Sequence, residues 1–143
     1  MSLYADTSFL VSLYTPDTDS AKAAHIMAQS ELPVVPTSFG ELELVNAIEL
    51  RTFRKELTRF QVKQALAMFH GDIASGVYFL KLLSATVFDR ALQLARKHMA
   101  RRGTRNLDIL HVASALDLHA KTFYTFDHRQ TGLAKAAGLR VLS

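Results

Sequence analysis

Short apolar runs alternate with longer stretches of helical spacing along the whole chain. Residues 3–5 form an apolar run that ends at Asp6, and residues 122–126 form a β-branched and aromatic run that ends at Asp127. Runs of this kind are typical of buried strands. Three more short strands are predicted, at residues 33–36, 77–80 and 139–142. The prolines that close the first of these are acceptable because a strand end need not donate to the ladder.

Helices are predicted between the strands, from apolar positions at helical spacing and from capping residues. The first begins at residues 6–8, and the others cover roughly residues 18–30, 37–54, 58–70, 86–101, 106–118 and 129–137. Strands that alternate with helices favour an α/β fold, with a parallel sheet covered by helices on both faces. A length of 143 residues suits a single domain over residues 1–143.

Several residues are predicted to start or stop these helices. Ser38 with Glu41 fits a capping box, and Thr86 with Asp89 forms a similar pair. Four further residues follow the same logic: Asn106 caps a helix, Gly103 ends one, and Gly71 and Gly76 bracket a loop.

Composition removes several classes of site. The chain has no cysteine, which excludes disulfides, thiolate zinc sites and cysteine catalysis. No apolar run approaches the roughly 18 residues of a membrane-spanning helix, and the first residues lack the basic segment of a signal peptide. We therefore expect a soluble, cytoplasmic protein without a membrane partner.

Charge is divided unevenly within a net charge of +4. Residues 1–50 contain one base and seven acids, whereas residues 51–105 contain twelve bases and three acids. A basic segment of this kind indicates either a polyanionic partner or a solvated helix surface that balances the acidic part. The charge pattern leaves both open.

Two acids follow predicted strands, at the edge where open α/β sheets place their ligands. Asp6 comes after residues 3–5, and Asp127 comes after the run that ends at Phe126. Each acid alone also fits a helix N-cap. Because both occupy matching positions, a functional site is favoured. Ser8 and Thr125 each stand two residues from one of these acids and are candidates to orient a carboxylate or a water molecule.

Two helices supply further acids. Glu43 lies on a helix face of small and apolar residues, and Glu41 lies about 200° away around the helix, so the face argument favours Glu43. Asp108 stands in the first turn of a strongly apolar helix, with His111 on the same face. An aspartate beside a histidine would suit zinc or iron. We favour instead a packed histidine that is hydrogen-bonded to a backbone carbonyl.

Four carboxylates near one another would repel unless a cation neutralised them. Oxygen ligands alone select Mg²⁺ or Mn²⁺. Such an ion activates water and positions a phosphodiester for in-line attack. The residues thus point to metal-dependent phosphoryl chemistry at Asp6, Glu43, Asp108 and Asp127.

Four segments, in this order and over essentially the whole chain, resemble the motifs of the PIN-domain ribonucleases, in particular the VapC-type toxins. The segments are Tyr4-Ala5-Asp6-Thr7-Ser8, Glu43-Leu44-Val45-Asn46-Ala47-Ile48, Arg105-Asn106-Leu107-Asp108-Ile109-Leu110-His111-Val112-Ala113 and Thr125-Phe126-Asp127. The resemblance implies a three-layer α/β/α sandwich with a central parallel sheet. It also implies an acidic cluster of Asp6, Glu43, Asp108 and Asp127 around Mg²⁺ or Mn²⁺, with His111 as a packing residue.

The activity implied by this resemblance is metal-dependent endonucleolytic cleavage of RNA by the toxin of a type II toxin–antitoxin pair. A cognate antitoxin and a homodimer are the implied protein partners. Ten bases become candidates for contact with RNA phosphates: Arg51, Arg54, Lys55, Arg59, Lys63, Arg96, Lys97, Arg101, Arg102 and Arg105.

One departure from the family pattern concerns the last motif. Many relatives carry a further acid there, whereas His128, Arg129 and Gln130 follow Asp127 here. We therefore expect one tightly bound ion, with a second arriving with the substrate. Two other functions stay open: a catalytically weak RNA-binding module of the same fold, and a magnesium-dependent phosphatase. The phosphatase chemistry requires a second aspartate two residues after Asp6, where this chain has Ser8.

Overall fold

A three-stranded parallel sheet lies at the centre of the computed structural model, which describes residues 2–143. The strands are β1 (Ser2–Ala5), β2 (Ala120–Tyr124) and β3 (Arg140–Leu142), in the order β1-β2-β3. The ends of β1 and β2 are in register, because Ala5 pairs with Tyr124. The residues that follow these two strands therefore emerge side by side.

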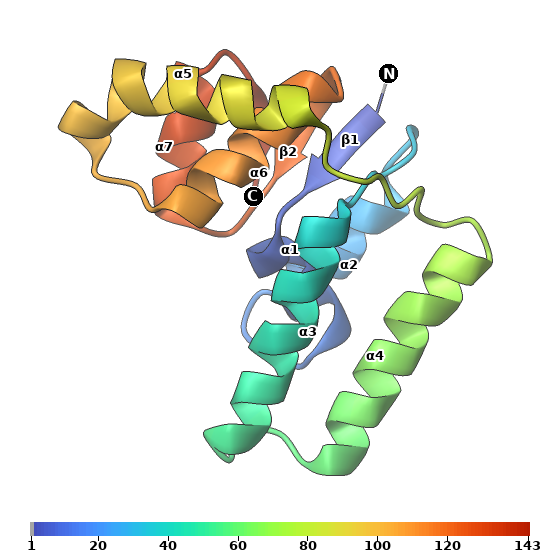
Figure 1. The fold of residues 1–143 in the computed structure, drawn as a ribbon. Coiled ribbons are helices and arrows are strands. Elements are labelled where there is room, and N and C mark those ends of the chain that lie inside the picture. The colour runs from blue at the N-terminus through green and yellow to red at the C-terminus, as the bar shows by residue number, and fades with distance from the viewer. Residues whose placement is uncertain (1) are drawn as a thin grey trace.

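Seven helices cover this sheet within the described residues. They are α1 (Thr7–Tyr14), α2 (Ser20–Ala28), α3 (Ser38–Phe53), α4 (Arg59–Ala74), α5 (Ala85–Arg102), α6 (Asn106–Asp117) and α7 (His128–Ala136). In Figure 1, α1 to α4 lie on one side of the sheet and α5 to α7 lie on the other. None of the helices in residues 2–143 is both long and apolar enough to cross a membrane.

Side chains alternate along the strands and so build a separate core on each face of the sheet. Leu3 and Tyr124 pack with α1 to α4 on one face, and Tyr4 and Phe123 pack with α5 to α7 on the other. This alternation is the period-two pattern of a strand buried on both faces. The predicted three-layer α/β/α fold is confirmed.

Two predicted strands are reduced to isolated bridges, so that prediction was wrong. Val34 makes single parallel bridges to Leu3 and to Tyr78, and Thr37 makes one to Lys81. The prolines on both sides of Val34–Val35 have no N–H group to donate, which prevents a longer ladder. Strand β2 also ends two residues before the predicted position, which leaves Thr125 and Phe126 beyond the sheet.

Both predicted capping pairs were placed wrongly. Thr37, rather than Ser38, caps α3 and accepts a hydrogen bond from the Gly40 N–H at 3.0 Å. The Glu41 carboxylate is turned outward and lies 3.2 Å from His70 Nε2. In α5 the N-cap is Ser84, and the Thr86 hydroxyl donates to Asp117 instead of pairing with Asp89.

The loop predicted between Gly71 and Gly76 begins later than expected, because α4 continues through Gly71 to Ala74. Ile73 packs against the core and Asp72 accepts a hydrogen bond from the Tyr14 hydroxyl. These contacts outweigh the low helix propensity of Gly71. Helix α6 likewise starts one position earlier than predicted, with Arg105 rather than Asn106 as its N-cap.

Candidate functional site

Asp6 lies at the end of β1, fully buried, and is the N-cap of α1. Its Oδ1 accepts hydrogen bonds from the Ser8 hydroxyl at 2.6 Å and from the Phe9 N–H at 3.0 Å. The Thr125 hydroxyl donates to Oδ2. Burial nevertheless raises the pKa of Asp6 above its ordinary value, and these donors only partly oppose that effect. The carboxylate is oriented by hydroxyls, and no ion pair within residues 2–143 involves it.

Asp127 follows β2 and is connected to Asp6 through Thr125. Its backbone N–H donates to Thr125 Oγ1 at 3.0 Å, and the same hydroxyl contacts Asp6. The Asp127 Oδ1 caps α7 by accepting from the N–H groups of Arg129 and Gln130, at 2.8 and 3.2 Å. Both acids are thus helix caps, and they also lie at one edge of the sheet. The two interpretations of the sequence are compatible.

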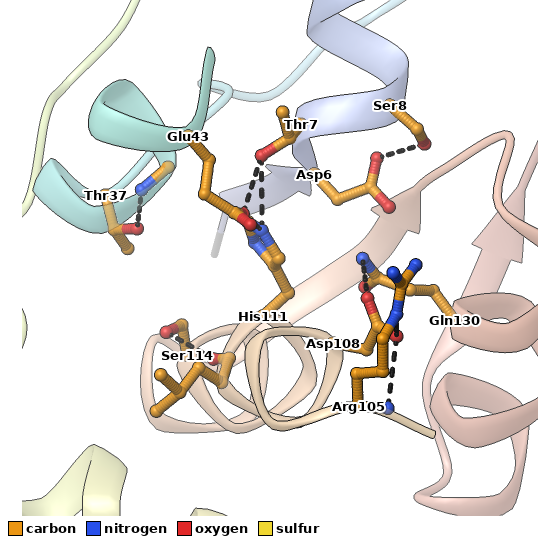
Figure 2. A network of polar contacts seen from close by, with 12 residues as sticks. Asp6, Thr7, Ser8, Thr37, Glu43, Arg105, Asp108, His111, Ser114 and Gln130 are labelled. Carbon is orange, nitrogen blue, oxygen red and sulfur yellow. Dashed lines mark hydrogen bonds and ion pairs between the residues drawn. The ribbon is translucent and has the colours of Figure 1, made fainter. Parts of the chain in front are cut away.

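Glu43 extends from α3 toward α6, where it meets His111 (Figure 2). It accepts a hydrogen bond from the Thr7 hydroxyl at 2.9 Å, and its Oε1 contacts His111 Nε2. Partial burial would raise the pKa of Glu43, but the hydrogen bonds that it accepts from His111 and Thr7 act in the opposite direction, and the net pKa is lowered. The face argument favoured Glu43 over Glu41 as a site residue; in the structure Glu43 contacts His111, whereas Glu41 contacts His70.

His111 is held from its other side by Tyr4, whose hydroxyl lies 2.7 Å from Nδ1. A carboxylate can only accept, so the hydrogen on Nε2 points to Glu43 and Nδ1 accepts from the tyrosine. Burial raises the pKa of Tyr4, which keeps its hydroxyl protonated. His111 packs in the core as expected, with Phe39 against its ring. The predicted bond to a backbone carbonyl was wrong, because both ring nitrogens contact side chains.

Asp108 is buried in the first turn of α6, and its two oxygens face different neighbours. Its Oδ2 accepts from the Arg105 N–H at 3.3 Å and lies 3.8 Å from the Arg105 guanidinium. Its Oδ1 faces Gln130 Nε2 at 3.5 Å. The Gln130 Oε1 is buried and has no hydrogen-bond partner among the described residues. Figure 2 shows Gln130 and Arg105 on either side of the Asp108 carboxylate.

The four acids are connected through intermediate residues and do not form one compact shell. Thr125 connects Asp6 to Asp127, while the Gln130 backbone contacts Asp127 and its side chain contacts Asp108. Within residues 2–143, no three histidine or acidic side chains are close enough together to hold a metal ion. Glu43 is directed to His111 instead.

The connecting residues were largely missed by sequence reasoning. Tyr4, Thr7 and Gln130 were not candidates, although each lies within three residues of a predicted acid. That proximity was the available signal: a polar side chain next to a strand end or in the first turn of a helix has few directions to take. The contact of His111 with Glu43 joins α6 to α3, and no local pattern encodes it.

The donors fit a hard divalent cation in chemical type. The site offers carboxylates, hydroxyls and an amide oxygen, the ligands that Mg²⁺ and Mn²⁺ prefer. Two observations support the fit: Asp6 is fully buried with a raised pKa, and the Gln130 Oε1 next to Asp108 has no partner among the described residues. A cation bound at either group would supply the positive charge or the partner that this group lacks.

Comparisons with known proteins identify a family and several similar structures. The PIN domain pattern matches residues 3–137. VapC20 of Mycobacterium tuberculosis, a toxin that cleaves the sarcin-ricin loop, has a similar structure, with a TM-score of 0.73, 20% identity and coverage of 96% of this chain and 95% of that one. VapBC2 from Rickettsia felis, bound to a DNA fragment from its promoter, is also similar. Its TM-score is 0.68 at 17% identity, with coverage of 99% of this chain and 98% of that one.

A third similar structure is VapBC-5 of Mycobacterium tuberculosis, a member of the VapBC family of toxin–antitoxin systems. Its TM-score is 0.59 at 19% identity, with coverage of 99% of this chain and 97% of that one. At these identities the structures establish the fold. No curated protein matches the chain in sequence.

Proposed function

The chain belongs to the PIN-domain family, and from that premise we propose that it is a metal-dependent endoribonuclease, the toxin of a type II toxin–antitoxin pair. Members of this family are typically ribonucleases and are commonly metal-dependent. The observation that carries the proposal is Asp6: a fully buried carboxylate, oriented by Ser8 and Thr125, at the edge of the sheet that Asp127 shares. We further propose that the whole chain acts as one domain.

Asp6, Glu43, Asp108 and Asp127 are the proposed ligands of one tightly held Mg²⁺ or Mn²⁺. When bound, the ion supplies water activation and charge neutralisation at the scissile phosphate. The chain's own contribution is orientation. Asp6 is held in one direction by two hydroxyls, so its oxygens keep their positions as charge develops.

Glu43 and His111 contribute a second oriented unit. The His111 Nε2–H and the Thr7 hydroxyl both donate to the Glu43 carboxylate. Because Tyr4 occupies Nδ1, the imidazole keeps one tautomer and one orientation. A carboxylate held this way accepts a proton or a ligand at a fixed position.

The protein partners are proposed on the similar structures. VapBC-5 is a toxin–antitoxin system, and VapC20 is a toxin. We propose that this chain is inhibited by an antitoxin of its own and that it forms a homodimer. RNA is the proposed substrate.

A catalytically weak RNA-binding module is the second candidate, and one observation favours it. The four acids do not lie in a single shell, and Glu43 contacts His111 instead of the other acids. If that arrangement persisted with a cation present, the protein would bind RNA without cutting it.

Cleavage of total RNA separates the two candidates. Wild-type protein is compared with Asp6→Asn, in Mg²⁺, in Mn²⁺ and in chelator. We expect discrete fragments only from the wild type with metal, with the Asp6→Asn rate lower by about 10²–10³-fold or more. Asp89→Asn removes the same charge at an exposed position of α5 and should cleave normally.

The opposite result has a definite meaning. A folded Asp6→Asn protein that cleaves at the wild-type rate would place the reaction elsewhere. RNA binding without metal-dependent fragments from the wild type would favour the binding module. Circular dichroism on each variant establishes that it is folded.

A further inference from the structure

The C-terminal half of α5 carries a group of cations around one surface cavity. Lys97, His98, Arg101 and Arg102 line this cavity of about 520 Å³, which we call the α5 cationic pocket. Among the described residues, no ion pair involves Lys97, Arg101 or Arg102. The pKa of His98 is lowered, by desolvation and by these three neighbouring cations. The pocket is therefore a concentrated and uncompensated positive surface.

Three of the other candidate bases are already paired with acids of the protein. The pairs are Arg51 with Glu56, Arg59 with Glu49, and Arg105 with Asp108. A paired base has less to gain from a phosphate than a free one, because the new contact replaces an existing one. Of the ten bases that the sequence suggested, Lys97, Arg101 and Arg102 line one cavity with no acid in its lining, whereas the cavity that Arg59 and Lys63 line also contains Glu49.

The pocket is close to the proposed nuclease site along α7. The Arg102 guanidinium lies over Gly132, where an added methyl group would be 2.7 Å from Nη1. Gly132 stands five residues after Asp127, the N-cap of the same helix. Five residues of helix extend about 7.5 Å. A nucleic-acid strand advances about 3.4 Å per nucleotide, so two or three nucleotides cover that distance.

We propose that the α5 cationic pocket binds the phosphodiester backbone of the RNA, two or three nucleotides from the bond that is cleaved. This inference rests on the proposed function. Arginine guanidinium groups donate in a fork that matches phosphate oxygens, and a histidine ring beside them offers a stacking surface for a base. RNA is favoured over an acidic protein as the occupant, because the pocket lies along α7 from the proposed nuclease site.

Removal of the three charges tests this proposal. The variant Lys97→Gln/Arg101→Gln/Arg102→Gln is compared with Arg54→Gln/Lys55→Gln/Lys63→Gln, which removes equal charge near the turn between α3 and α4. Figure 1 shows that turn at the opposite end of the molecule from the end of α5. The probe is a fluorescent single-stranded RNA of mixed sequence, about 16 nucleotides long, in chelator and at several salt concentrations.

The pocket variant should bind RNA at least about tenfold more weakly than the wild type. The plot of log K against log salt has a negative slope, and the loss of three phosphate contacts should make that slope shallower by about two. In the cleavage assay, KM should rise while kcat at saturating RNA stays near the wild-type value, because the pocket does not touch the reacting atoms. The control variant should keep the salt slope within one of the wild type.

A second variant moves Arg102 without changing any charge. The methyl group of Gly132→Ala would displace the Arg102 guanidinium, whose flexible side chain has room to shift, while alanine favours the helix. We expect a stable protein with weaker RNA binding. Unchanged binding by this variant would mean that Arg102 does not hold RNA where it lies.

The outcomes separate this inference from the proposed function. If the wild type yields no fragments but RNA binding depends on the pocket, the pocket stands and the nuclease proposal fails. If the wild type cleaves RNA and the two triple variants behave alike, the pocket proposal is overturned. It is also overturned if the pocket variant binds RNA normally and loses binding to a polyglutamate peptide, because the pocket would then serve an acidic protein.

Discussion

Glu43 depends on side chains from three different elements. Tyr4 of β1 holds His111 of α6, and His111 together with Thr7 of α1 holds the Glu43 carboxylate. Tyr4 never reaches Glu43, so it acts as a positioning residue. Groups that orient a ligand in this way typically affect metal affinity or activity by 10- to 100-fold.

Tyr4→Phe should therefore lower the cleavage rate by about 10-fold or more, because His111 loses the partner that fixes its tautomer. The same change should lower the free energy of unfolding by about 1 kcal/mol, the usual net contribution of one hydrogen bond. Cleavage assays at several Mn²⁺ concentrations and urea unfolding measure the two effects.

Tyr124→Phe is the matched control for this prediction. Tyr124 is also buried on a strand of the sheet, and its hydroxyl contacts the Ser30 hydroxyl at 2.9 Å instead of a residue of the candidate site. It should lose similar stability and keep its activity. Equal losses of activity in the two variants would show that Tyr4 contributes only to the fold.

At the scale of elements, α5 and α6 pack together in the core and are further connected by one carboxylate. Asp117 ends α6 and accepts from the hydroxyls of Thr86 at 2.8 Å and Ser84 at 3.1 Å, and it lies 3.5 Å from the Arg90 guanidinium. The hydrogen bond from Thr86 is the main reason why the pKa of Asp117 falls below its ordinary value. The folded protein thus favours the ionised form.

This contact should make stability depend on pH in a definite direction. A lowered pKa contributes stability that is present above about pH 4, the unfolded value, and is lost as the pH falls through the folded value. Asp117→Asn should cost about 1 kcal/mol at neutral pH, and the difference should be smaller at about pH 2. Urea unfolding at both pH values tests this, with Asp89→Asn as a control that shows no loss at neutral pH.

The order of elements was predictable, whereas several of their boundaries were not. The apolar run that ends at Asp6 is typical of a strand buried on both faces, and the structure has strand β1 there. The choice of Thr37 over Ser38 as a cap was not predictable, because both hydroxyl residues fit the local pattern. Whether the segment around Val34 forms a strand depends on how many residues of neighbouring segments pair with it, and the local sequence does not give that number.

The candidate site shows the same division. Asp6 and Asp127 were placed by a rule that concerns the whole sheet, namely that parallel strands end at one edge. The contacts of Gln130 with Asp108 and of His111 with Glu43 join segments that are distant in sequence. Periodicity can give the face on which a residue lies, but it does not give the partner opposite that face.

For the whole molecule, the buried Asp6 carboxylate lowers the free energy of unfolding at neutral pH, and a bound cation would remove this effect. Because its pKa is raised in the folded state, the folded protein holds a proton that the unfolded chain has released. Stability from this group is therefore greatest below about pH 4 and declines as the pH rises through the folded value. Asp6→Asn should be more stable than the metal-free wild type at neutral pH, and this advantage should vanish near pH 4.

Metal binding should reverse that order. An ion that binds only the folded protein stabilises it by about 2.7 kcal/mol at a hundredfold excess over Kd. For a domain of this size, that corresponds to a rise in Tm of roughly 10 °C. Thermal unfolding in Mn²⁺ should show this rise in the wild type and in Asp89→Asn, which lacks an exposed acid only, and no rise in Asp6→Asn. An equal rise in all three proteins would place the ion away from Asp6, and a flat response in all three would remove the metal from the proposed function.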